Sequence, residues 1–205
     1  MQADILSAVS DNRVEALKSL IESGGNINAV SNKGESVLVK AAILGHVECI
    51  KLLLDAGAGK KEEALIYAAH YGVEAGVKLL LEAGADANAR RYIHLQNRSG
   101  LMTPLVAAST PEVLKLLLAA GANVNSHNLS PLDAIFEQGD KRTTGIDYGW
   151  KIKMLIDVGA DVNLRNPLTK SIRRGYGWRL LNFLSKLVLM LLVHWLLYLT
   201  IENLR

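Results

Sequence analysis

The chain has 205 residues, of which 50% are hydrophobic but only 5% are aromatic, so its core must consist mainly of Leu, Ala, Val and Ile, which favours helices. The formal net charge of +3 excludes the strong basic field that is typical of nucleic-acid-binding proteins, and we expect no nucleic acid as a partner. A single cysteine, Cys49, excludes an internal disulfide, and the polar N-terminus lacks the apolar run of a signal peptide. We therefore expect the chain in a reducing, cytosolic compartment.

One short phrase recurs along the chain, each time after a run of leucine and other apolar residues. A glycine opens the phrase, and the clear copies are Gly24–Asn28, Gly84–Asn88, Gly121–Asn125 and Gly159–Asn163, with a weaker copy at Gly57-Ala58. Glycine readily adopts the left-handed backbone conformation that ends a helix, and the Asn and Asp residues after it favour a tight turn. The phrase predicts a repeated unit of helix, stop and turn.

A second signal precedes the leucine runs of several units. It consists of a Ser or Thr, in two cases followed by Pro, at Ser36-Val37-Leu38, Thr103-Pro104-Leu105 and Ser130-Pro131-Leu132. Ser and Thr cap helix N-termini, and Pro is favoured at the first helical position. A first, shorter helix is therefore expected to begin at each of these sites, which makes two helices in each unit.

These residues resemble the ankyrin repeat, whose pattern is roughly T-P-L-H-x-A-x-x-x-G-H, a leucine-rich helix and G-A-D-V-N. The best copy runs from Ser36 to Gly57 with Gly45-His46 in its middle, and the step from Gly24 to Gly57 is 33 residues, the family's period. The resemblance implies an all-α ankyrin-repeat solenoid of about five to six helix-turn-helix units over residues 1–165. It also implies a degenerate sixth repeat at residues 166–186 and a role for His46 in fixing neighbouring turns.

The chain departs from this pattern at four places. The turn between units is shortened at residues 57–63 and lengthened at residues 84–103. The connection between the two helices of a unit is shortened at residues 109–112 and lengthened at residues 138–150. Loops tolerate insertions, so neutral drift and a binding role are both open for the lengthened segments. In the resembling fold these two insertions lie on opposite edges of the groove.

Catalysis, metal binding and cofactor binding have no candidate residues in the sequence. The five histidines are scattered without the spacing of metal ligands, and Cys49 occupies a helix position that the family fills with an apolar residue. We expect no enzyme activity, no metal, no cofactor and no small-molecule substrate. The implied function is that of a scaffold that binds another protein through the ankyrin groove and its finger loops.

Partner-binding candidates gather in two places. The first helices of the second and third repeats are expected to line the groove with Lys40, Ile43, Tyr67, His70 and Tyr71. The lengthened turn, loop 89–101, adds Arg90, Arg91, Tyr92, His94 and Arg98. Arginine and aromatic residues are enriched in protein interfaces. Tyr67 and Tyr71 are four residues apart and are expected to form one aromatic patch, unless either packs against the neighbouring repeat.

The last part of the chain differs from the rest in composition. Between Arg179 and Glu202 the only formal charge is that of Lys186. At about 1.5 Å per residue, a helix over Leu180–Ile201 would span a hydrocarbon core of roughly 30 Å. Residues 180–205 are therefore expected to form a hydrophobic tail that anchors the cytosolic repeats to a membrane. The alternative is a packed terminal helix pair or a degenerate cap on a fully soluble adaptor.

Overall fold

The computed structural model describes residues 2–95, 98–126, 130–138 and 149–161. The chain divides into two units, residues 1–124 and residues 125–205. The predicted degenerate repeat at 166–186 and the hydrophobic tail at 180–205 lie outside the described residues.

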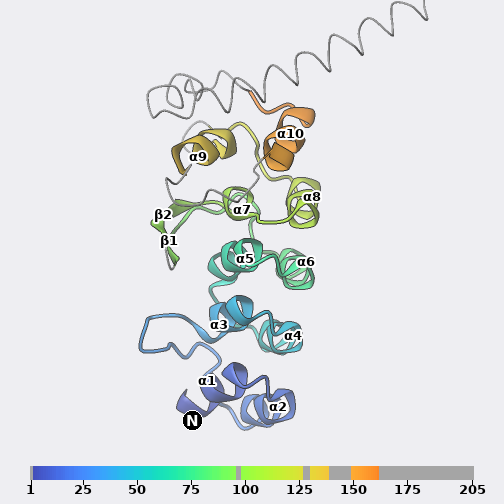
Figure 1. The fold of residues 1–205 in the computed structure, drawn as a ribbon. Helices are drawn as coiled ribbons and strands as arrows, with labels where there is room; N and C mark the ends of the chain where they lie inside the picture. The colour runs from blue at the N-terminus through green and yellow to red at the C-terminus, as the bar shows by residue number, and fades with distance from the viewer. Residues whose placement is uncertain (1, 96–97, 127–129, 139–148, 162–205) are drawn as a thin grey trace, which may run out of the picture. The chain divides into compact units, whose positions relative to one another are not determined.

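The first unit is a stack of helix pairs (Figure 1). The first helices of the pairs are α1 (Gln2–Ser10), α3 (Val37–Leu44), α5 (Lys61–His70) and α7 (Pro104–Ala107). The second helices are α2 (Val14–Glu22), α4 (Val47–Asp55), α6 (Glu74–Glu82) and α8 (Pro111–Ala119). First helices pack on first helices and second helices on second helices along the stack. The predicted order of two helices to a unit is confirmed.

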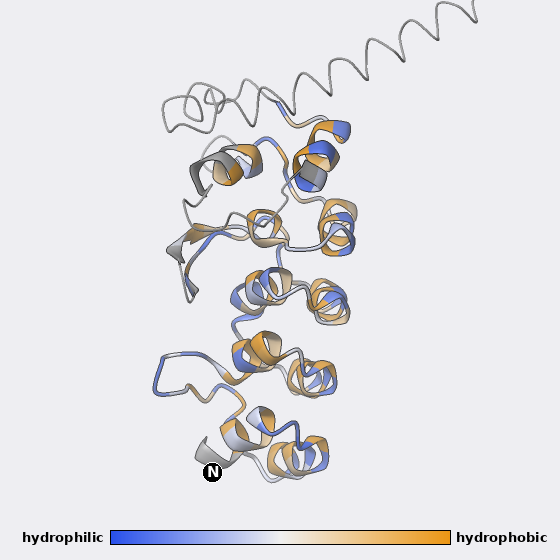
Figure 2. Cartoon of the chain, viewed as in Figure 1, coloured by the Kyte–Doolittle hydropathy of each residue, from blue (hydrophilic) through white to orange (hydrophobic). Residues whose placement is uncertain are grey.

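Apolar residues three positions apart hold the second helices in the stack. They share one helix face and are fully buried in three successive repeats: Ile50 and Leu53, Val77 and Leu80, Leu114 and Leu117. Burying one such side chain contributes about 1.5–3 kcal/mol. Figure 2 shows apolar and polar residues on each of these helices, as the amphipathic pattern requires.

Local signals end and begin the helices where the sequence predicts. Gly57 has a φ of +84°, and an added Cβ would meet no atom within 4 Å there, so backbone conformation rather than space requires glycine. The next N–H, of Ala58, donates to the carbonyl of Leu53 at 2.8 Å, which closes the helix end. At two helix starts Ser36 Oγ and Thr103 Oγ1 accept from the backbone N–H three residues on, at 3.3 and 3.2 Å.

The lengthened turn after α6 forms a β-hairpin. Strands β1 (Arg91–Leu95) and β2 (Arg98–Met102) pair antiparallel, with Tyr92 opposite Leu101 and Ile93 opposite Gly100. The prediction of an all-α chain is wrong for this segment. Alternating side chains explain the difference, because Ile93 is buried while Tyr92 and His94 on either side of it are exposed.

The shortened connection in the fourth repeat is confirmed. Helix α7 has only four residues, and α8 begins soon after it at Pro111, with Thr110 as its cap. Ser109 between them donates from both its N–H and its Oγ to the carbonyl of Ala69, at 3.1 and 3.2 Å. The short connection is thereby bonded to the end of α5 in the preceding repeat.

The second unit contains α9 (Pro131–Gln138) and α10 (Gly149–Asp157) in its described part. Helix α10 ends as α4 does, since Gly159 has a φ of +87° and the N–H of Ala160 donates to the carbonyl of Leu155 at 2.9 Å. Most of the predicted insertion at 138–150 lies outside the described residues. Among the helices that the structure describes, none combines the length and the apolar character needed to cross a membrane.

Candidate functional site

In the copies of the repeated phrase that the structure describes in full, the closing asparagine bonds to the next turn. Asn28 Oδ1 accepts from the N–H of Gly59 at 2.8 Å, and Asn88 Oδ1 accepts from the N–H of Asn123 at 2.7 Å. Asn88 also donates from Nδ2 to the carbonyl of Gly121 at 3.0 Å. These bonds fix the base of one turn against the base of the next. A binding surface that runs across several turns therefore has a defined spacing.

Lysine replaces asparagine at the shortened turn. Lys61 stands four residues after Gly57, where the other repeats have Asn, and its Nζ donates to the carbonyl of Ala83 at 3.0 Å. An ammonium group can donate but cannot accept, so only the donor half of the asparagine's role is retained. The link between successive turns continues through the irregular repeat in this altered form.

Two polar contacts hold the hairpin against α5. The phenol of Tyr67 donates to the backbone carbonyl of His94 at 3.0 Å, and Tyr67 is only 6% exposed. Arg91 forms an ion pair of 3.5 Å with Glu62 at the start of the same helix. Burial is the main cause that raises the pKa of Tyr67, and nearby Glu63 adds to it, so the phenol keeps its donor proton through the neutral range.

The hairpin lies beside the place where the preceding turn is short. Five residues, Ala56–Lys60, connect α4 to α5, whereas a long finger over residues 23–36 connects α2 to α3. Strand β1 packs on α5, and Figure 1 shows the hairpin reaching from the level of α7 toward that of α5. The hairpin, which is the finger of the fourth repeat, thus covers the side of the third repeat that the short turn at residues 56–60 leaves open.

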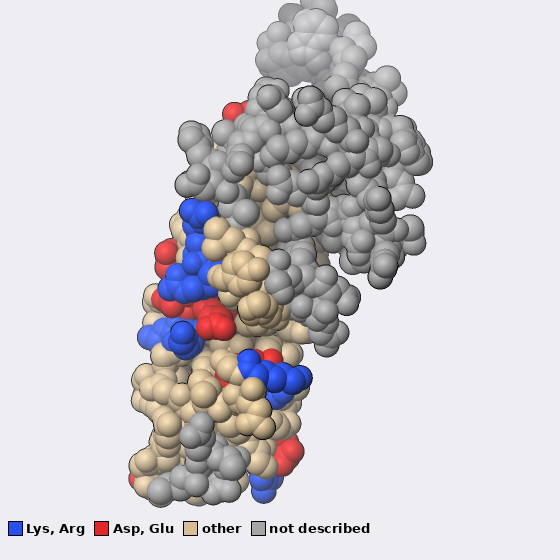
Figure 3. Space-filling view, turned by 90° about the vertical axis from the view of Figure 1, so that its left-hand side faces the viewer, with Lys and Arg blue, Asp and Glu red and all other residues tan. Residues whose placement is uncertain are grey.

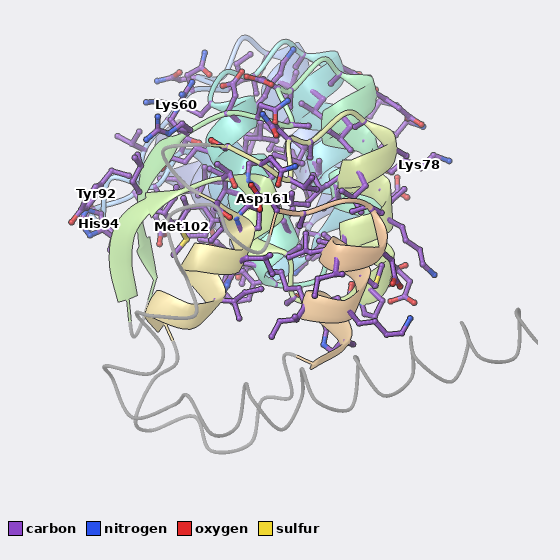
Figure 4. All side chains as sticks on the ribbon, turned by 90° about the horizontal axis from the view of Figure 1, so that it is seen from above. Lys60, Lys78, Tyr92, His94, Met102 and Asp161 are labelled. Atoms are coloured by element: carbon purple, nitrogen blue, oxygen red, sulfur yellow. The ribbon has the colours of Figure 1, made fainter. Side chains whose placement is uncertain are left out.

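The outer face of the hairpin carries exposed aromatic and apolar side chains. Tyr92 is 63% exposed, and Leu101 directly across the strand pair is 40% exposed. The Tyr92 and His94 rings meet edge to face with their centroids 5.2 Å apart, within the range of about 4.5–7 Å that aromatic pairs prefer. Figure 4 shows Tyr92 and His94 pointing away from the helices, whereas Met102 lies on the inner side. We refer to Tyr92, His94 and Leu101 as the hairpin's outer face.

The predicted aromatic patch of Tyr67 and Tyr71 is divided between two places. Tyr67 is buried under the hairpin, which agrees with the alternative that a tyrosine packs on the neighbouring repeat. Tyr71 lies at the end of α5, is 41% exposed and contacts the ring of His70 at a centroid distance of 5.0 Å. Tyr71 stands nine positions after Glu62, roughly 13 Å away along the helix axis. His70 and Tyr71 form a second, separate pair.

The remaining candidates from the lengthened turn lie on or beside the hairpin. Arg90 is exposed just before β1, Arg91 opens the strand, and Arg98 is placed by its backbone opposite Leu95. Sequence reasoning missed Leu101 and Glu62. The signal for Leu101 was the alternation of apolar and polar residues on both sides of Gln96-Asn97, a pattern that predicts a hairpin.

Two further residues named from the sequence have structural roles. His46 Nδ1 lies 2.8 Å from the carbonyl oxygen of Val9, near the end of α1 in the preceding repeat, which agrees with the predicted role of His46 in fixing neighbouring turns. Cys49 is fully buried, and its thiol contacts Asn12 Oδ1 at 3.5 Å. Burial, with Glu48 as a second cause, raises the pKa of the Cys49 thiol. A buried and protonated thiol is a poor nucleophile, as expected of a small core residue.

Stacked helix pairs, glycine-closed helices and projecting turns define a repeat solenoid, a class of protein that offers an extended surface for binding. The chain belongs to the ankyrin-repeat family, because the family model for ankyrin repeats in three copies matches residues 5–91 and the single ankyrin-repeat model matches residues 101–129. No curated protein sequence matches the chain.

Among solved structures, the crystal structure of the human ASB11 ankyrin repeat domain is similar to this chain. The TM-score is 0.56 at 26% sequence identity, and the match covers 82% of this chain and 76% of that one. The ankyrin-repeat domain is a non-catalytic fold that generally binds proteins. Among the described residues, no group of three His, Cys, Asp or Glu side chains is placed to hold a metal ion.

Proposed function

We propose that this chain is a protein-binding scaffold whose partner contacts the hairpin's outer face. The observation that carries the proposal is that the Tyr92 side chain is 63% exposed. The next residue of the strand, Ile93, is buried and anchors the opposite face of β1. Tyrosine and arginine are the residues that most often dominate binding energy at protein interfaces. Arg90 and Arg91 supply the charged part of this surface beside the hairpin.

Anchoring supports the proposal as much as exposure does. The Tyr67 bond to the His94 carbonyl and the ion pair of Arg91 with Glu62 hold β1 in place before any partner arrives. A surface that is ordered in advance loses less conformational entropy when it binds. We assign Tyr67 to positioning the hairpin, and we assign direct contact to Tyr92 and His94. His70 and Tyr71 form a secondary contact on the exposed end of α5.

Affinity capture with a matched control tests this function. The full chain is immobilised, exposed to lysate of its source cells, and compared with the double variant Tyr92→Ala/His94→Ala by quantitative mass spectrometry. Leu44→Ala is the control, because Leu44 is an apolar side chain with 40% exposure at the end of α3, outside the hairpin and α5. We expect a specific protein to be depleted about tenfold or more by the double variant and to be retained by the control. Equal retention by all three chains would place the site elsewhere.

We also propose that the hydrophobic tail anchors the scaffold to a membrane. The proposal rests on sequence alone: residues 180–201 carry one formal charge, on Lys186, and lie outside the described residues. Such a stretch has the length of a membrane-spanning helix. Carbonate extraction of the full chain, with a 1–178 truncation as the control, tests it. The full chain should stay in the pellet and the truncation in the supernatant; two soluble proteins would contradict the anchor.

A further inference from the structure

We infer that the hairpin's outer face and the start of α5 together form a docking surface for an acidic peptide segment that carries an apolar side chain. This inference rests on the protein-binding function proposed above and specifies the chemistry of its partner. It combines a local excess of positive charge with the exposed pair Tyr92 and Leu101.

Positive charge gathers where β1 meets α5. The ion pair between Arg91 and Glu62, at 3.5 Å, brings the start of the strand against the start of the helix. Lys60 and Arg90 stand next to this contact in the chain, and both are exposed. Neither takes part in an ion pair within the described residues, whereas Glu62 is already occupied by Arg91. Glu63, in the same turn of α5, is one negative charge against the two positive charges of Lys60 and Arg90, so the unpaired charge at this junction is mainly positive.

On the opposite side of the first unit, acidic residues outnumber basic residues. Helices α2, α4, α6 and α8 carry few basic residues, namely Lys18, Lys51, Lys78 and Lys115. Their acidic residues are more numerous: Glu15, Glu22, Glu48, Asp55, Glu74, Glu82 and Glu112. An acidic segment is therefore repelled from the second helices and attracted to the hairpin side, over a range of about 8 Å at physiological salt.

The apolar component lies on the same side of the unit. Tyr92 has the largest exposed fraction, 63%, of the large hydrophobic side chains in the described part of the chain. Leu101 is its direct partner across the strands, so the two side chains share one face. Figure 3 views this side and shows Lys and Arg side chains next to Asp and Glu side chains and to uncharged surface. A ligand with both an apolar group and negative charge suits this mixed surface.

Basic and aromatic residues together also occur in single-stranded nucleic-acid sites. The charges favour a peptide instead, because Glu62 and Glu63 lie in the first turn of α5 and the net charge of the whole chain is only +3. A continuous phosphate backbone would meet these carboxylates, whereas a peptide can place its acidic side chains beside Lys60 and Arg90 alone. The experiment includes nucleic acid as an outcome.

Selection from a random peptide display library on the full chain tests the inference. Enriched peptides should be rich in Asp and Glu and contain an aromatic or aliphatic residue. The most enriched peptide, labelled with fluorescein, is then measured by anisotropy. The double variant Lys60→Glu/Arg90→Glu should bind it about tenfold more weakly, and added salt should weaken binding to the parent chain.

A matched control separates local from overall charge. Lys51→Glu/Lys78→Glu makes the same change in net charge on exposed positions of α4 and α6, and Figure 4 shows Lys78 on the side away from Tyr92. This control should bind within about twofold of the parent chain. Circular dichroism confirms that each variant is folded.

Three outcomes would overturn the inference, and they differ in what they leave standing. Enriched peptides without acidic bias that lose binding in Tyr92→Ala would refute the charge argument but retain the hairpin as a binding site. Peptides insensitive to both Tyr92→Ala and the Lys60/Arg90 variant would refute the hairpin site as well. Tighter binding of a labelled oligothymidine than of any acidic peptide would identify the surface as a nucleic-acid site.

Discussion

Tyr67 on α5 donates its phenolic hydrogen to the backbone carbonyl of His94 on β1 at 3.0 Å, across 27 residues of sequence. Together with the ion pair of Arg91 with Glu62, this bond joins the enlarged finger to the preceding repeat. The position of the proposed contact surface thus depends on a buried residue of another repeat.

Replacing Tyr67 by Phe should loosen the hairpin without disturbing the helix pairs. The change removes the hydrogen bond and keeps the ring, so we expect a loss of about 1 kcal/mol in the free energy of unfolding, measured by urea denaturation. Amide hydrogen exchange should accelerate in residues 91–102 more than in α3 and α4. Uniform acceleration along the chain would show that Tyr67 supports the whole unit and not the hairpin in particular.

Alkaline pH should release the same contact. Burial, assisted by Glu63, raises the pKa of Tyr67 above its ordinary value of about 10. The phenol is neutral while protonated, so its contribution to stability is fully present below the ordinary pKa and is lost as the pH rises through the raised value. Titration followed by phenolate absorbance should show a late-ionising tyrosine that is missing in Tyr67→Phe. An unchanged titration curve in that variant would contradict this assignment.

The bonds between successive turns should differ in strength from repeat to repeat. Asn88 makes two bonds to the next turn, at 2.7 and 3.0 Å, whereas Lys61 makes one, at 3.0 Å. We expect Asn88→Ala to reduce the free energy of unfolding by about 2 kcal/mol and Lys61→Ala by about 1 kcal/mol. Lys60→Ala, at the exposed neighbouring position, should change it by less than about 0.5 kcal/mol. Urea denaturation of the three variants checks this order.

Truncation of core leucines should lower the free energy of unfolding much more than loss of these hydrogen bonds does. Leu53 and Leu80 are fully buried in α4 and α6, so truncation of either to Ala should cost about 2–5 kcal/mol. Leu44→Ala is the control, because Leu44 is 40% exposed and leaves little cavity. Thermal and urea unfolding measure the differences. Changes under about half a kcal/mol at both core sites would contradict the register of the stack.

The helix pairs could be predicted from the sequence because their signals are local. Gly57 ends α4 through its own backbone conformation, and Ser36 caps α3 through a bond to a residue three positions away. Neither signal needs knowledge of distant parts of the chain. Shortened and lengthened connections could be located for the same reason, by comparing each segment with the repeated phrase.

The site could be predicted only in part because it depends on contacts distant in sequence. A spacing of four residues puts Tyr67 and Tyr71 on one helix face, but it does not reveal that the hairpin covers Tyr67 and leaves Tyr71 exposed. The composition of loop 89–101 predicts Tyr92 and His94 as binding residues. Their outward direction follows from the pairing of β1 with β2. A loop at residues 89–101, as the sequence predicts, has no such pairing.

Site-specific photo-crosslinking tests the central claim, that a protein partner contacts the hairpin's outer face, most directly. A photoreactive phenylalanine analogue is placed at position 92 in one chain and at position 78 in another, since Tyr92 and Lys78 are both exposed and point to opposite sides of the first unit. Both chains are irradiated in the source cells, and the adducts are identified by mass spectrometry. We predict a discrete protein adduct from position 92 and none from position 78. Equal adducts from both positions, or an adduct from position 78 alone, would contradict the claim.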